Sequence, residues 1–427
     1  MTTRVRTLWT GAVLLATMWL AGCGHYVCGA TFGNSSCTAS GSGLSQSGGT
    51  TSSSAFVFAV DEGVNGAATG AIDGFALNTS AVTFGPISSF TAPTVPLNNG
   101  GTGMAVAQDQ FLYAAFGSVN QIFGWTISSS GALTAISGSP FSSPAAGGFI
   151  GGVGQDNLIV NPAGNLLFIS DASTSSVYTY SIGTGGVLAL VGTTPCPTGF
   201  TPMNLATDGL GKYLYVIDGT FATHQGSGIA AFSIGTGGTL TSVSGSPFTG
   251  TDFKMWQVKG DPSGQFLVGT SGTTVPYNGV DDDHLYVFKI TQSGTTAGAI
   301  SFVNTVSTQF SPFSIAVSPN SSGNLVYSFG FNDTATSFNP IEGFTISSSG
   351  GLTPISGEPF AIGEGSWGQF DQSGSQLFVY ASFIDQSTNT VVTQISPLSV
   401  GSGGTLTEPV ANTTLVTPGF WAVADVP

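Results

Sequence analysis

The sequence predicts an all-β fold, a seven-bladed β-propeller, on the strength of three observations. A unit of roughly fifty residues, clearest over residues 203–248, reads as four short apolar runs that each end in a turn, which is typical of strands and hairpins. The third run of this unit recurs seven times along the chain. The last apolar run, residues 419–424, supplies the innermost strand that the first unit, starting at Ala55, lacks. Such units cannot bury their faces alone, so they stack on one another in a ring.

The composition fits a β protein and excludes several classes of function. Only 6% of the 427 residues are charged, 41% are hydrophobic and 63 are Gly. No apolar run long enough to span a membrane as a helix occurs beyond residue 22. The formal net charge is −15, and Arg is absent after Arg6. An acidic surface repels phosphate groups and no bidentate anion clamp can form without Arg, so we expect neither a nucleic-acid partner nor a phosphorylated or anionic substrate.

Residues 1–22 have the pattern of an export signal that is removed from the mature protein. Arg4 and Arg6 form a basic start, an apolar stretch follows, and small residues precede Cys23. The string Leu-Ala-Gly-Cys at residues 20–23 resembles the lipobox of bacterial lipoproteins at every position. That resemblance implies cleavage before Cys23, acylation of this residue, and anchoring to the bacterial cell envelope on its periplasmic or outer face. The alternative is an ordinary secretory signal with an incidental cysteine, which also exports the protein.

Residues 23–54 are rich in Gly, Ser and Thr, which predicts a flexible tether that holds the body of the protein, residues 55–427, away from the membrane. Cys28 and Cys37 lie in this tether. In an oxidising compartment they can form a disulfide that closes a small loop and leaves Cys196 unpaired. The alternative is that all three remain thiols or pair otherwise. Cys28 and Cys37 lack the spacing and companion ligands of a zinc site.

The first recurring element of the body is a tight polar turn followed by an aromatic-rich strand. Asp or Asn starts the turn with its side chain, Pro presets φ, and Gly takes the position that needs a positive φ. The copies begin at Asn161, Asp208, Asp261, Pro319 and Asp371, with a degenerate copy at Gln108. We interpret these turns as structural.

The second recurring element is an alternating strand that ends in a Gly-rich hairpin. Its seven copies span residues 72–78, 122–128, 177–183, 229–235, 285–291, 341–347 and 392–401. Three units then end in a shared phrase, Ser-Gly-Ser-Pro-Phe or Ser-Gly-Glu-Pro-Phe, at residues 137–141, 244–248 and 356–360. Seven such units with complementary ends favour a closed propeller over a pair of β-sandwiches, which explains neither the number of units nor the ends.

Two of these phrases resemble a known family. They are Asp-Pro-Ser-Gly-Gln-Phe-Leu at residues 261–267 and Ala-Ala-Phe-Ser-Ile-Gly-Thr-Gly-Gly-Thr-Leu at residues 230–240. Both resemble phrases of the lactonase-type seven-bladed propellers, which include 6-phosphogluconolactonases and muconate-lactonizing enzymes. The resemblance covers residues 55–427 and implies blade architecture, together with His, Glu and Arg at the channel mouth. No Arg is present in this part of the chain, and neither that Arg nor that His can be matched to a residue here.

The candidate ligand site lies at one mouth of the channel, which the loops between blades share with the loops between second and third strands. The richest of these loops ends in Asp281, Asp282 and Asp283, followed by His284. These carboxylates and the imidazole can bind Ca²⁺ or another divalent ion, or supply a general base. Because successive strand residues point to opposite faces, at most two of the groups converge without a bend. A solvated acidic loop is the structural alternative.

A second loop in the preceding blade carries Asp218 and His224, so the two His-bearing loops can face each other near the mouth. Asp218, His224 and His284 are therefore the candidate catalytic residues, with a lone surface His as the alternative at each imidazole. Aromatic residues form a further candidate site, because they fall at the starts of innermost strands. Trp256, Phe313, Trp367 and Trp421 can ring the mouth and stack on a sugar or a flat ligand, or instead pack between blades.

These observations favour an exported, envelope-anchored lipoprotein whose propeller is a monomeric binding module. Its expected partners are the membrane, through the lipid anchor, and a protein or carbohydrate ligand. Apart from the candidate Ca²⁺ site, no cofactor is expected. The alternative is a lactonase-like hydrolase or isomerase with a degenerate or shifted active site that acts on a neutral substrate. An enzyme of this kind requires two or more titratable groups to converge at the mouth.

Overall fold

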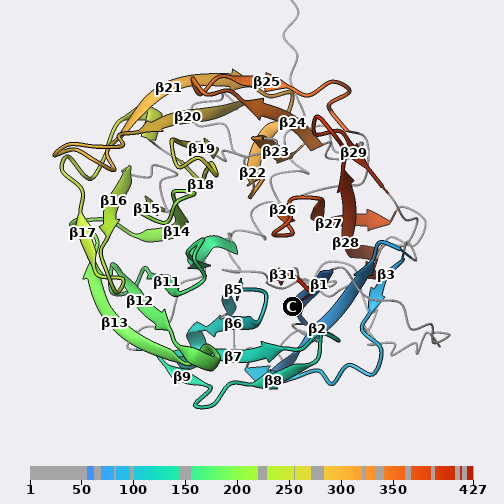
Figure 1. Ribbon diagram of the computed structural model, residues 1–427. Coiled ribbons are helices and arrows are strands. Elements are labelled where there is room, and N and C mark those ends of the chain that lie inside the picture. Colours follow the sequence, from blue (N-terminus) through green and yellow to red (C-terminus); the bar gives the residue numbers. More distant parts are fainter. Residues whose placement is uncertain are drawn as a thin grey trace, which may run out of the picture.

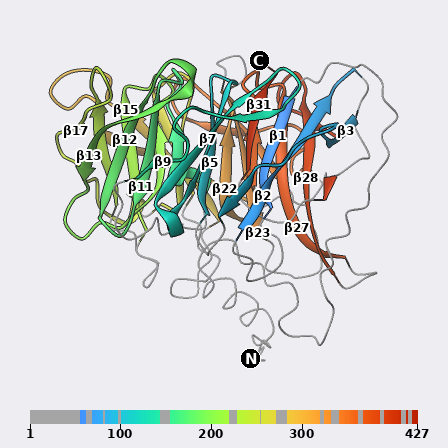
Figure 2. The same cartoon turned by 90° about the horizontal axis from the view of Figure 1, so that it is seen from below.

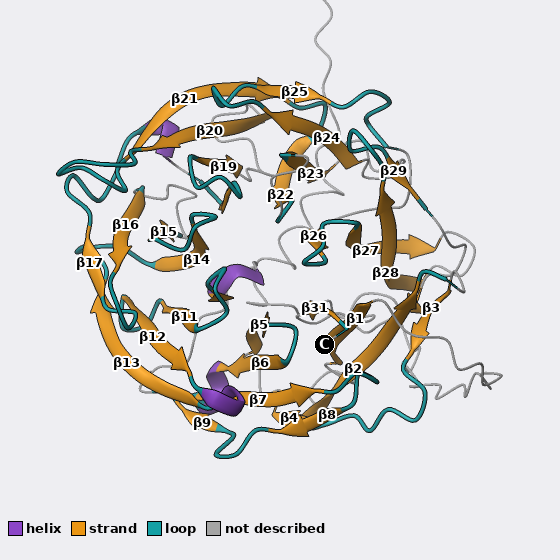
Figure 3. Ribbon diagram, viewed as in Figure 1, coloured by secondary structure: helices purple, strands orange, loops and turns teal. Residues whose placement is uncertain are grey.

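The computed structural model describes residues 55–61, 69–80, 83–96, 101–143, 155–219, 228–253, 255–270, 283–319, 324–331, 341–360, 367–385, 390–408, 414–415 and 421–426. Their strands form seven antiparallel sheets arranged around a central axis (Figures 1 and 3). Helical residues in these ranges are confined to the short 3-10 turns η1 (Gly117–Val119), η2 (Gln155–Asn157), η3 (Thr184–Gly186) and η4 (Thr251–Phe253). Within the same ranges, no helix has the length and apolar character needed to span a membrane. The predicted all-β, seven-bladed propeller is confirmed.

Each blade is a meander whose strands can be counted outward from the axis. The innermost strands are β31 (Trp421–Asp425), β5 (Gly101–Ala107), β10 (Leu158–Val160), β14 (Pro202–Thr207), β18 (Gln257–Gly260), β22 (Ser311–Val317) and β26 (Trp367–Phe370) for blades 1 to 7. The second strands are β1 (Ala55–Asp61), β6 (Phe111–Phe116), β11 (Leu166–Asp171), β15 (Tyr213–Asp218), β19 (Phe266–Thr270), β23 (Leu325–Phe331) and β27 (Gln376–Asp385). Neighbouring innermost strands contact one another all the way round the ring, including β31 with β5.

The third strands coincide with the seven alternating segments predicted from the sequence. They are β2 (Thr69–Asn78), β7 (Gln121–Ile127), β12 (Ser176–Ile182), β16 (Ile229–Ile234), β20 (His284–Ile290), β24 (Ile341–Ile346) and β28 (Thr390–Val400). The outer strands are β3 (Thr83–Pro86) with β4 (Thr94–Pro96), β8 (Leu133–Ala135) with β9 (Phe141–Ser142), β13 (Leu188–Pro195), β17 (Leu240–Ser242), β21 (Ile300–Ser307), β25 (Leu352–Pro354), and β29 (Leu406–Thr407) with β30 (Thr414–Leu415).

The shared Ser-Gly-Ser/Glu-Pro-Phe phrase explains why some outer strands are short. In all three copies the bond before Pro is cis, and the chain turns there. The Phe that follows returns to pair with the first part of the third strand, as Phe141 with Ile122 and Phe248 with Ile229. The outer strands β13 and β21, whose blades lack the phrase, continue through a register shift instead and are eight residues long.

The core consists of seven apolar clusters, one between each pair of neighbouring blades. Alternation along the strands produces this arrangement. On β6, Leu112 and Phe116 face blade 1, whereas Phe111 and Tyr113 face blade 3. Burial of one large apolar side chain stabilises the fold by about 1.5–3 kcal/mol. Because the clusters lie between blades, the stability of each blade depends on its two neighbours.

Strand β31 completes the first blade, as the two ends of the sequence predict. It pairs with β1 from Ala55 opposite Asp425 to Ala59 opposite Trp421. Trp421 is 1% exposed and lies in the cluster between blades 7 and 1. The ring therefore closes through hydrogen bonds and packing, and β1 is not left as an open edge.

The polar turns between first and second strands are structural, in agreement with the prediction. Oδ1 of Asp261 accepts hydrogen bonds from the backbone N–H groups of Gln265 at 2.9 Å and Phe266 at 2.6 Å. Asn161 and Asp208 bind the equivalent N–H groups of their own turns. These three side chains are at least nine-tenths buried, so their oxygen atoms replace water as partners of the turn backbone.

Candidate functional site

All seven innermost strands begin at one face of the ring, because each blade repeats the same meander. In Figure 2 the C-terminal end, just after β31, lies at the top of the molecule, so the innermost strands begin at the lower face. The ends of the second strands lie at this face as well. Residues at the starts of the innermost strands therefore define the candidate site.

A layer of buried polar side chains occupies one register position on four successive blades. In each of these blades, one residue of the innermost strand pairs with the fourth residue of the second strand. The polar residue is the one directly before it: Asn157, Asn204, Gln257 and Ser314 in blades 3 to 6. Their exposed fractions are 1%, 1%, 3% and 1%, respectively. Buried polar groups are costly unless they are hydrogen-bonded, so this layer requires partners within the protein.

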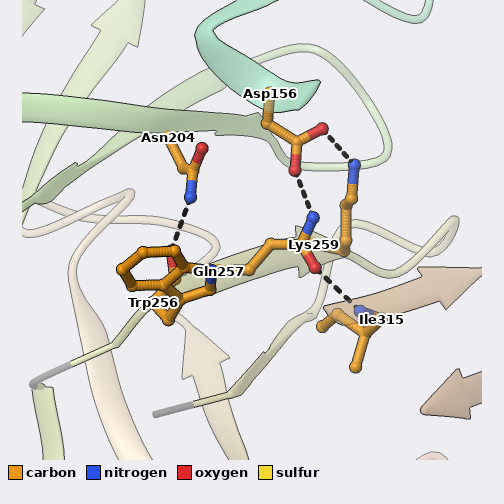
Figure 4. A network of polar contacts seen from close by, with 6 residues as sticks. All are labelled: Asp156, Asn204, Trp256, Gln257, Lys259 and Ile315. Carbon is orange, nitrogen blue, oxygen red and sulfur yellow. Dashed lines mark hydrogen bonds and ion pairs between the residues drawn. The ribbon is translucent and has the colours of Figure 1, made fainter. Parts of the chain in front are cut away.

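Asp156 joins this polar layer to an ammonium group (Figure 4). Its carboxylate accepts a hydrogen bond from Nε2 of Gln257 at Oδ2 and from Nζ of Lys259 at Oδ1, both at 2.5 Å. The Asp156 side chain is only 8% exposed, whereas that of Lys259 is 32% exposed. Within the described ranges, this is the only ion pair between a lysine and a carboxylate. The Lys259 side chain is therefore partly exposed, while its counter-ion stays buried.

Gln257 extends the network to a further blade. Its Oε1 accepts a hydrogen bond from the backbone N–H of Ile315 on β22 at 2.7 Å. Since Asp156 precedes β10, these bonds link blade 3 through blade 5 to blade 6. Asn204 of blade 4 donates from Nδ2 to the carbonyl of Trp256 at 2.6 Å. Both amide side chains are thus used to hold the starts of the innermost strands together (Figure 4).

Three of the four predicted aromatic residues form a continuous row across blades 5, 6 and 7. The ring centroids of Trp256 and Phe313 are 5.4 Å apart. Those of Phe313 and Trp367 are 4.6 Å apart, with the rings edge to face at 85°. Phe313 is 5% exposed, whereas both indoles are partly exposed. Trp421 is not part of this row, because it lies in the buried cluster between blades 7 and 1.

Thr270 fixes the backbone of two members of this aromatic row. Its carbonyl accepts the N–H of Trp256 at 2.6 Å, and its Oγ1 donates to the carbonyl of Phe313 at 3.4 Å. Thr270 is fully buried at the end of β19. One residue of blade 5 therefore sets the spacing between aromatic side chains of blades 5 and 6.

Asp218, a candidate catalytic residue, lies at the end of β15 and is 1% exposed. Its Oδ1 accepts the backbone N–H of Thr201 at 2.7 Å, just before β14. The neighbouring thiol of Cys196 is free. Burial raises the pKa of Cys196 to about 12, with the charge of Asp218 adding to the shift. Asp218 therefore stabilises the backbone before β14, and Cys196 stays protonated at neutral pH.

His284 begins β20, the third strand of blade 5, and its Nε2 lies 3.3 Å from Oγ of Ser307 on the outer strand β21. Asp283, just before it, binds the N–H of Thr308 through its backbone carbonyl. These residues are therefore on the outer half of blade 5. Asp218, by contrast, belongs to the second strand of blade 4.

The remaining predicted positions lie outside the described residues. They are the lipid-attachment residue Cys23, the cysteines Cys28 and Cys37, the candidate base His224, and two of the three candidate Ca²⁺ ligands, Asp281 and Asp282. Among the residues that are described, no group of three or more His, Cys, Asp and Glu side chains is arranged to hold a metal ion.

The Asp156–Lys259 pair and the buried polar layer were not identified from the sequence. A signal for the layer does exist, because aligning the repeats places Asn, Asn, Gln and Ser in one column, each followed by an apolar residue that starts the pairing. No comparable signal exists for the ion pair. Asp156 and Lys259 are 103 residues apart and two blades apart, and only the closed ring brings them together.

The geometry defines the chemistry that this site can perform. An ammonium group has three N–H donors, and Lys259 directs one of them at Asp156. Its other donors can stabilise negative charge that develops on a carbonyl oxygen, and a carboxylate can accept a proton from water. In the described part of the site, the one cation is neutralised by one carboxylate, so a phosphate group finds no excess positive charge.

Comparisons with known proteins support the fold. No family model matches the sequence, and no curated protein matches it either. Among solved structures, a protein from Bacteroides fragilis, provisionally named a 6-phosphogluconolactonase, matches with a TM-score of 0.60 at 16% identity, over 89% of this chain and 100% of that one. A periplasmic gluconolactonase from Pseudomonas aeruginosa matches with a TM-score of 0.55 at 15% identity, over 88% and 100%. A Lactobacillus plantarum protein matches with a TM-score of 0.57 at 17% identity, over 87% and 99%.

These similarities agree with the resemblance stated from the turn phrases. The chain has the fold of the lactonase-type seven-bladed propellers, and the matches extend over almost the whole of each of these three structures. At such low identity the similarity concerns the fold, and the chemistry has to be argued from the site itself.

Proposed function

We propose that this protein hydrolyses an uncharged lactone at the face where the innermost strands begin. The observation that carries the proposal is the pairing of Asp156 with Lys259. A buried carboxylate and the ammonium of a partly exposed lysine side chain lie within hydrogen-bond distance there, with the lysine on an innermost strand of the ring. This is the convergence of two titratable groups that an enzyme requires.

The proposed reaction uses the two groups in different roles. The Lys259 ammonium donates a hydrogen bond to the lactone carbonyl oxygen and stabilises the oxyanion that forms when water attacks the acyl carbon. Asp156 accepts the proton of the attacking water and returns it to the ring oxygen as the carbon–oxygen bond breaks. Gln257, which donates to the same carboxylate, is a positioning residue that keeps Asp156 directed at Lys259.

The choice of a lactone and the requirement for an uncharged one have separate support. Two of the structurally similar proteins carry the names 6-phosphogluconolactonase and gluconolactonase, which favours a lactone over other acyl compounds. The phosphorylated substrate implied by the first name fits this chain poorly. The protein has no Arg beyond Arg6, and the described cation of the site is already paired with a carboxylate.

The proposal places this activity at the bacterial cell envelope. The support is the lipobox-like string that ends at Cys23, followed by a tether that separates the anchor from the propeller. Residues 1–22 are proposed to be the signal, residues 23–54 the lipidated tether and residues 55–427 the propeller. Recovery of the full-length protein in the membrane fraction of bacterial cells checks this part.

A non-catalytic binding module is the second candidate function. It is favoured by the places of two residues named from the sequence: Asp218 accepts a backbone N–H at the end of β15, and His284 lies beside Ser307 at the start of β20. The partly exposed aromatic row gives such a module a surface for a ligand. The two candidates differ in whether a bound lactone is opened.

The test is hydrolysis of three lactones by the full-length protein in detergent, followed in a pH-stat and corrected for spontaneous opening. D-glucono-1,5-lactone and dihydrocoumarin are uncharged, and 6-phospho-D-glucono-1,5-lactone is anionic. We expect turnover of at least one uncharged lactone. Lys259→Met and Asp156→Asn are each expected to lower kcat by about 100-fold or more, since each removes a group used in the transition state.

The matched control is Lys289→Met, which removes an exposed lysine from β20 of the same blade and should leave kcat unchanged. Equal turnover by Lys259→Met and the wild-type protein would contradict the proposed site. Binding without turnover would favour the binding module. Faster opening of the phosphorylated lactone would show that the argument from charge is wrong.

A further inference from the structure

The aromatic row, together with the hydrogen bonds already made by the polar layer, indicates which class of lactone this site binds. Resting on the proposed hydrolase, we infer that the lactone taken by this site carries a flat apolar ring, such as a fused aromatic ring, rather than a polyhydroxylated sugar ring. The acyl group faces Lys259, and the apolar ring lies on the row formed by Trp256, Phe313 and Trp367.

The aromatic row begins directly before the strand that carries the lysine of the ion pair. Trp256 directly precedes β18, and Lys259 lies three residues further along the same strand. At about 3.3 Å per residue, their backbones are about 10 Å apart. We place one small bicyclic molecule across this distance, with its ring on an indole and its carbonyl group toward the ammonium.

The amide groups of Gln257 and Asn204 in the polar layer already have partners. Gln257 uses Nε2 for Asp156 and Oε1 for Ile315, while Nδ2 of Asn204 is directed at the Trp256 carbonyl. Recognition of a sugar ring requires several polar groups that converge on its hydroxyls. Breaking these contacts to bind hydroxyls would leave buried groups of the protein without partners, which is costly.

The aromatic row is held in place by hydrogen bonds and ring contacts within the protein. Thr270 holds the backbone at both Trp256 and Phe313, and Asn204 holds the carbonyl of Trp256. Phe313 is packed against the indoles on both sides. A pre-organised row loses little conformational entropy when a flat ring stacks on it, so such a ring binds with little ordering cost.

The charge of the protein also favours an uncharged ring. The formal net charge of the protein is −15, and the ammonium of Lys259 is paired with Asp156. An anionic ring therefore gains no attraction on approach, whereas an uncharged aromatic ring is indifferent to the overall field. Stacking on indole then becomes the main source of affinity, and the ammonium contributes in the transition state.

The experiment compares dihydrocoumarin, a fused aromatic lactone, with D-glucono-1,5-lactone on the full-length protein. We expect kcat/KM for dihydrocoumarin to be about tenfold higher or more, which is the effect of stacking one ring. Trp256→Leu and Trp367→Leu should each raise the KM for dihydrocoumarin about tenfold and change kcat little, because stacking stabilises substrate and transition state alike. Phe302→Leu, which alters a 41% exposed aromatic ring on the outer strand of blade 5, should change neither constant.

Direct binding separates this inference from the proposed hydrolase. Chroman has the fused ring of dihydrocoumarin and no acyl group, and we expect it to quench the tryptophan fluorescence of the wild-type protein in a saturable manner, which needs no variant to fold. Quenching by chroman without hydrolysis of any lactone would support the aromatic site and reject the hydrolase. Preferred hydrolysis of D-glucono-1,5-lactone, with no saturable quenching by chroman, would overturn the inference and leave the hydrolase standing.

Discussion

Buried carboxylates in this molecule differ in what their oxygen atoms meet. Asp208 and Asp261 bind backbone N–H groups of their own turns, so they stabilise local structure. Asp156 instead meets two side chains of another blade, one of them an ammonium. All three are Asp in the sequence. The partners, and not the residue type, separate a turn from a candidate site.

Glu342 is a third kind of buried carboxylate, because its hydrogen bonds offset only part of the cost of burying its charge. It is 3% exposed, and its Oε1 accepts the N–H of Gln309 at 2.9 Å. Burial raises its pKa to about 7, and the carboxylates of Glu358 and Asp283 add to the shift, against hydrogen bonds from the N–H groups of Gln309 and Phe310. The protonated form is therefore favoured in the folded state. The protonated Glu342 carboxyl therefore adds to the free energy of unfolding. This contribution is complete below about pH 4.5 and is lost as the pH rises through about 7.

Replacement of Glu342 by Gln should remove this loss of stability. We expect Glu342→Gln to raise the free energy of unfolding by about 1–3 kcal/mol at pH 8, and to change it little at pH 4.5. Chemical denaturation at the two pH values measures the difference. The control is Glu408→Gln, which alters an exposed carboxylate of the same charge. A gain in stability that is equal at both pH values would speak against titration of Glu342 as the cause.

At the scale of the element, the Gly-rich hairpins do more than reverse the chain. Gly186, in the hairpin of blade 3, has φ of +79°, and a Cβ there would lie 2.5 Å from Cδ1 of Phe111 in blade 2. Its carbonyl also accepts the hydroxyl of Tyr113 at 2.6 Å. The same contact, between a hairpin glycine and the preceding blade, recurs at Gly238, Gly298, Gly350 and Gly404. The hairpins are thus contacts between neighbouring blades.

Two adjacent glycines allow this role to be separated from the demands of the turn. Gly185 has φ of +70° and nothing within 4 Å of an added Cβ. Gly185→Ala should therefore lower the free energy of unfolding by only about 1–2 kcal/mol, because alanine disfavours the left-handed conformation. Gly186→Ala adds a steric clash with Phe111 to the same backbone effect, so it should lower the free energy of unfolding by about 3 kcal/mol or more. Denaturant unfolding of both variants measures the difference. Equal losses would mean that the hairpin does not stabilise the interface between blades.

At the scale of the whole molecule, three carboxylates gather where the ring closes. Asp425 at the end of β31 donates its backbone N–H to Oδ1 of Asp109 in blade 2 at 3.0 Å. Burial raises the pKa of Asp425 to about 6, with the charges of Asp371 and Asp109 adding to the shift, against hydrogen bonds from the N–H groups of Gln372 and Ser373. Burial likewise raises the pKa of Asp109. The non-covalent joint of the ring therefore carries groups whose ionisation opposes folding.

The closure should accordingly weaken as the pH rises. The stabilisation from protonated Asp425 is complete below about pH 4 and is lost through about pH 6. We expect Asp425→Asn to slow amide hydrogen exchange in β31 and β1 about tenfold at pH 7.5, after correction for intrinsic rates, with little effect on β15. Asp252→Asn, which alters an exposed aspartate, is the control. Exchange that slows equally in every blade would point to a general effect of charge rather than to the joint.

The sequence predicted the fold well because the information is local and repeated. The turn at Asp261 and the alternating strand at residues 229–235 each specify their own conformation, and repetition shows how the units stack. The site was predicted less well. The aromatic residues Trp256, Phe313 and Trp367 were named because they fall at the starts of innermost strands, whereas Asp218 and His284 were chosen by residue type.

By itself, then, the sequence determined that this protein is a ring of seven antiparallel sheets closed by its last strand, with a net negative charge. These properties follow from side-chain alternation, turn chemistry and net charge, which act over a few residues or over the whole composition. Only the tertiary structure decided that Asp156 pairs with Lys259 and that the rings of Trp256, Phe313 and Trp367 contact one another across three blades. Such contacts join residues of different blades, and their geometry is set by closure of the ring rather than by any local pattern.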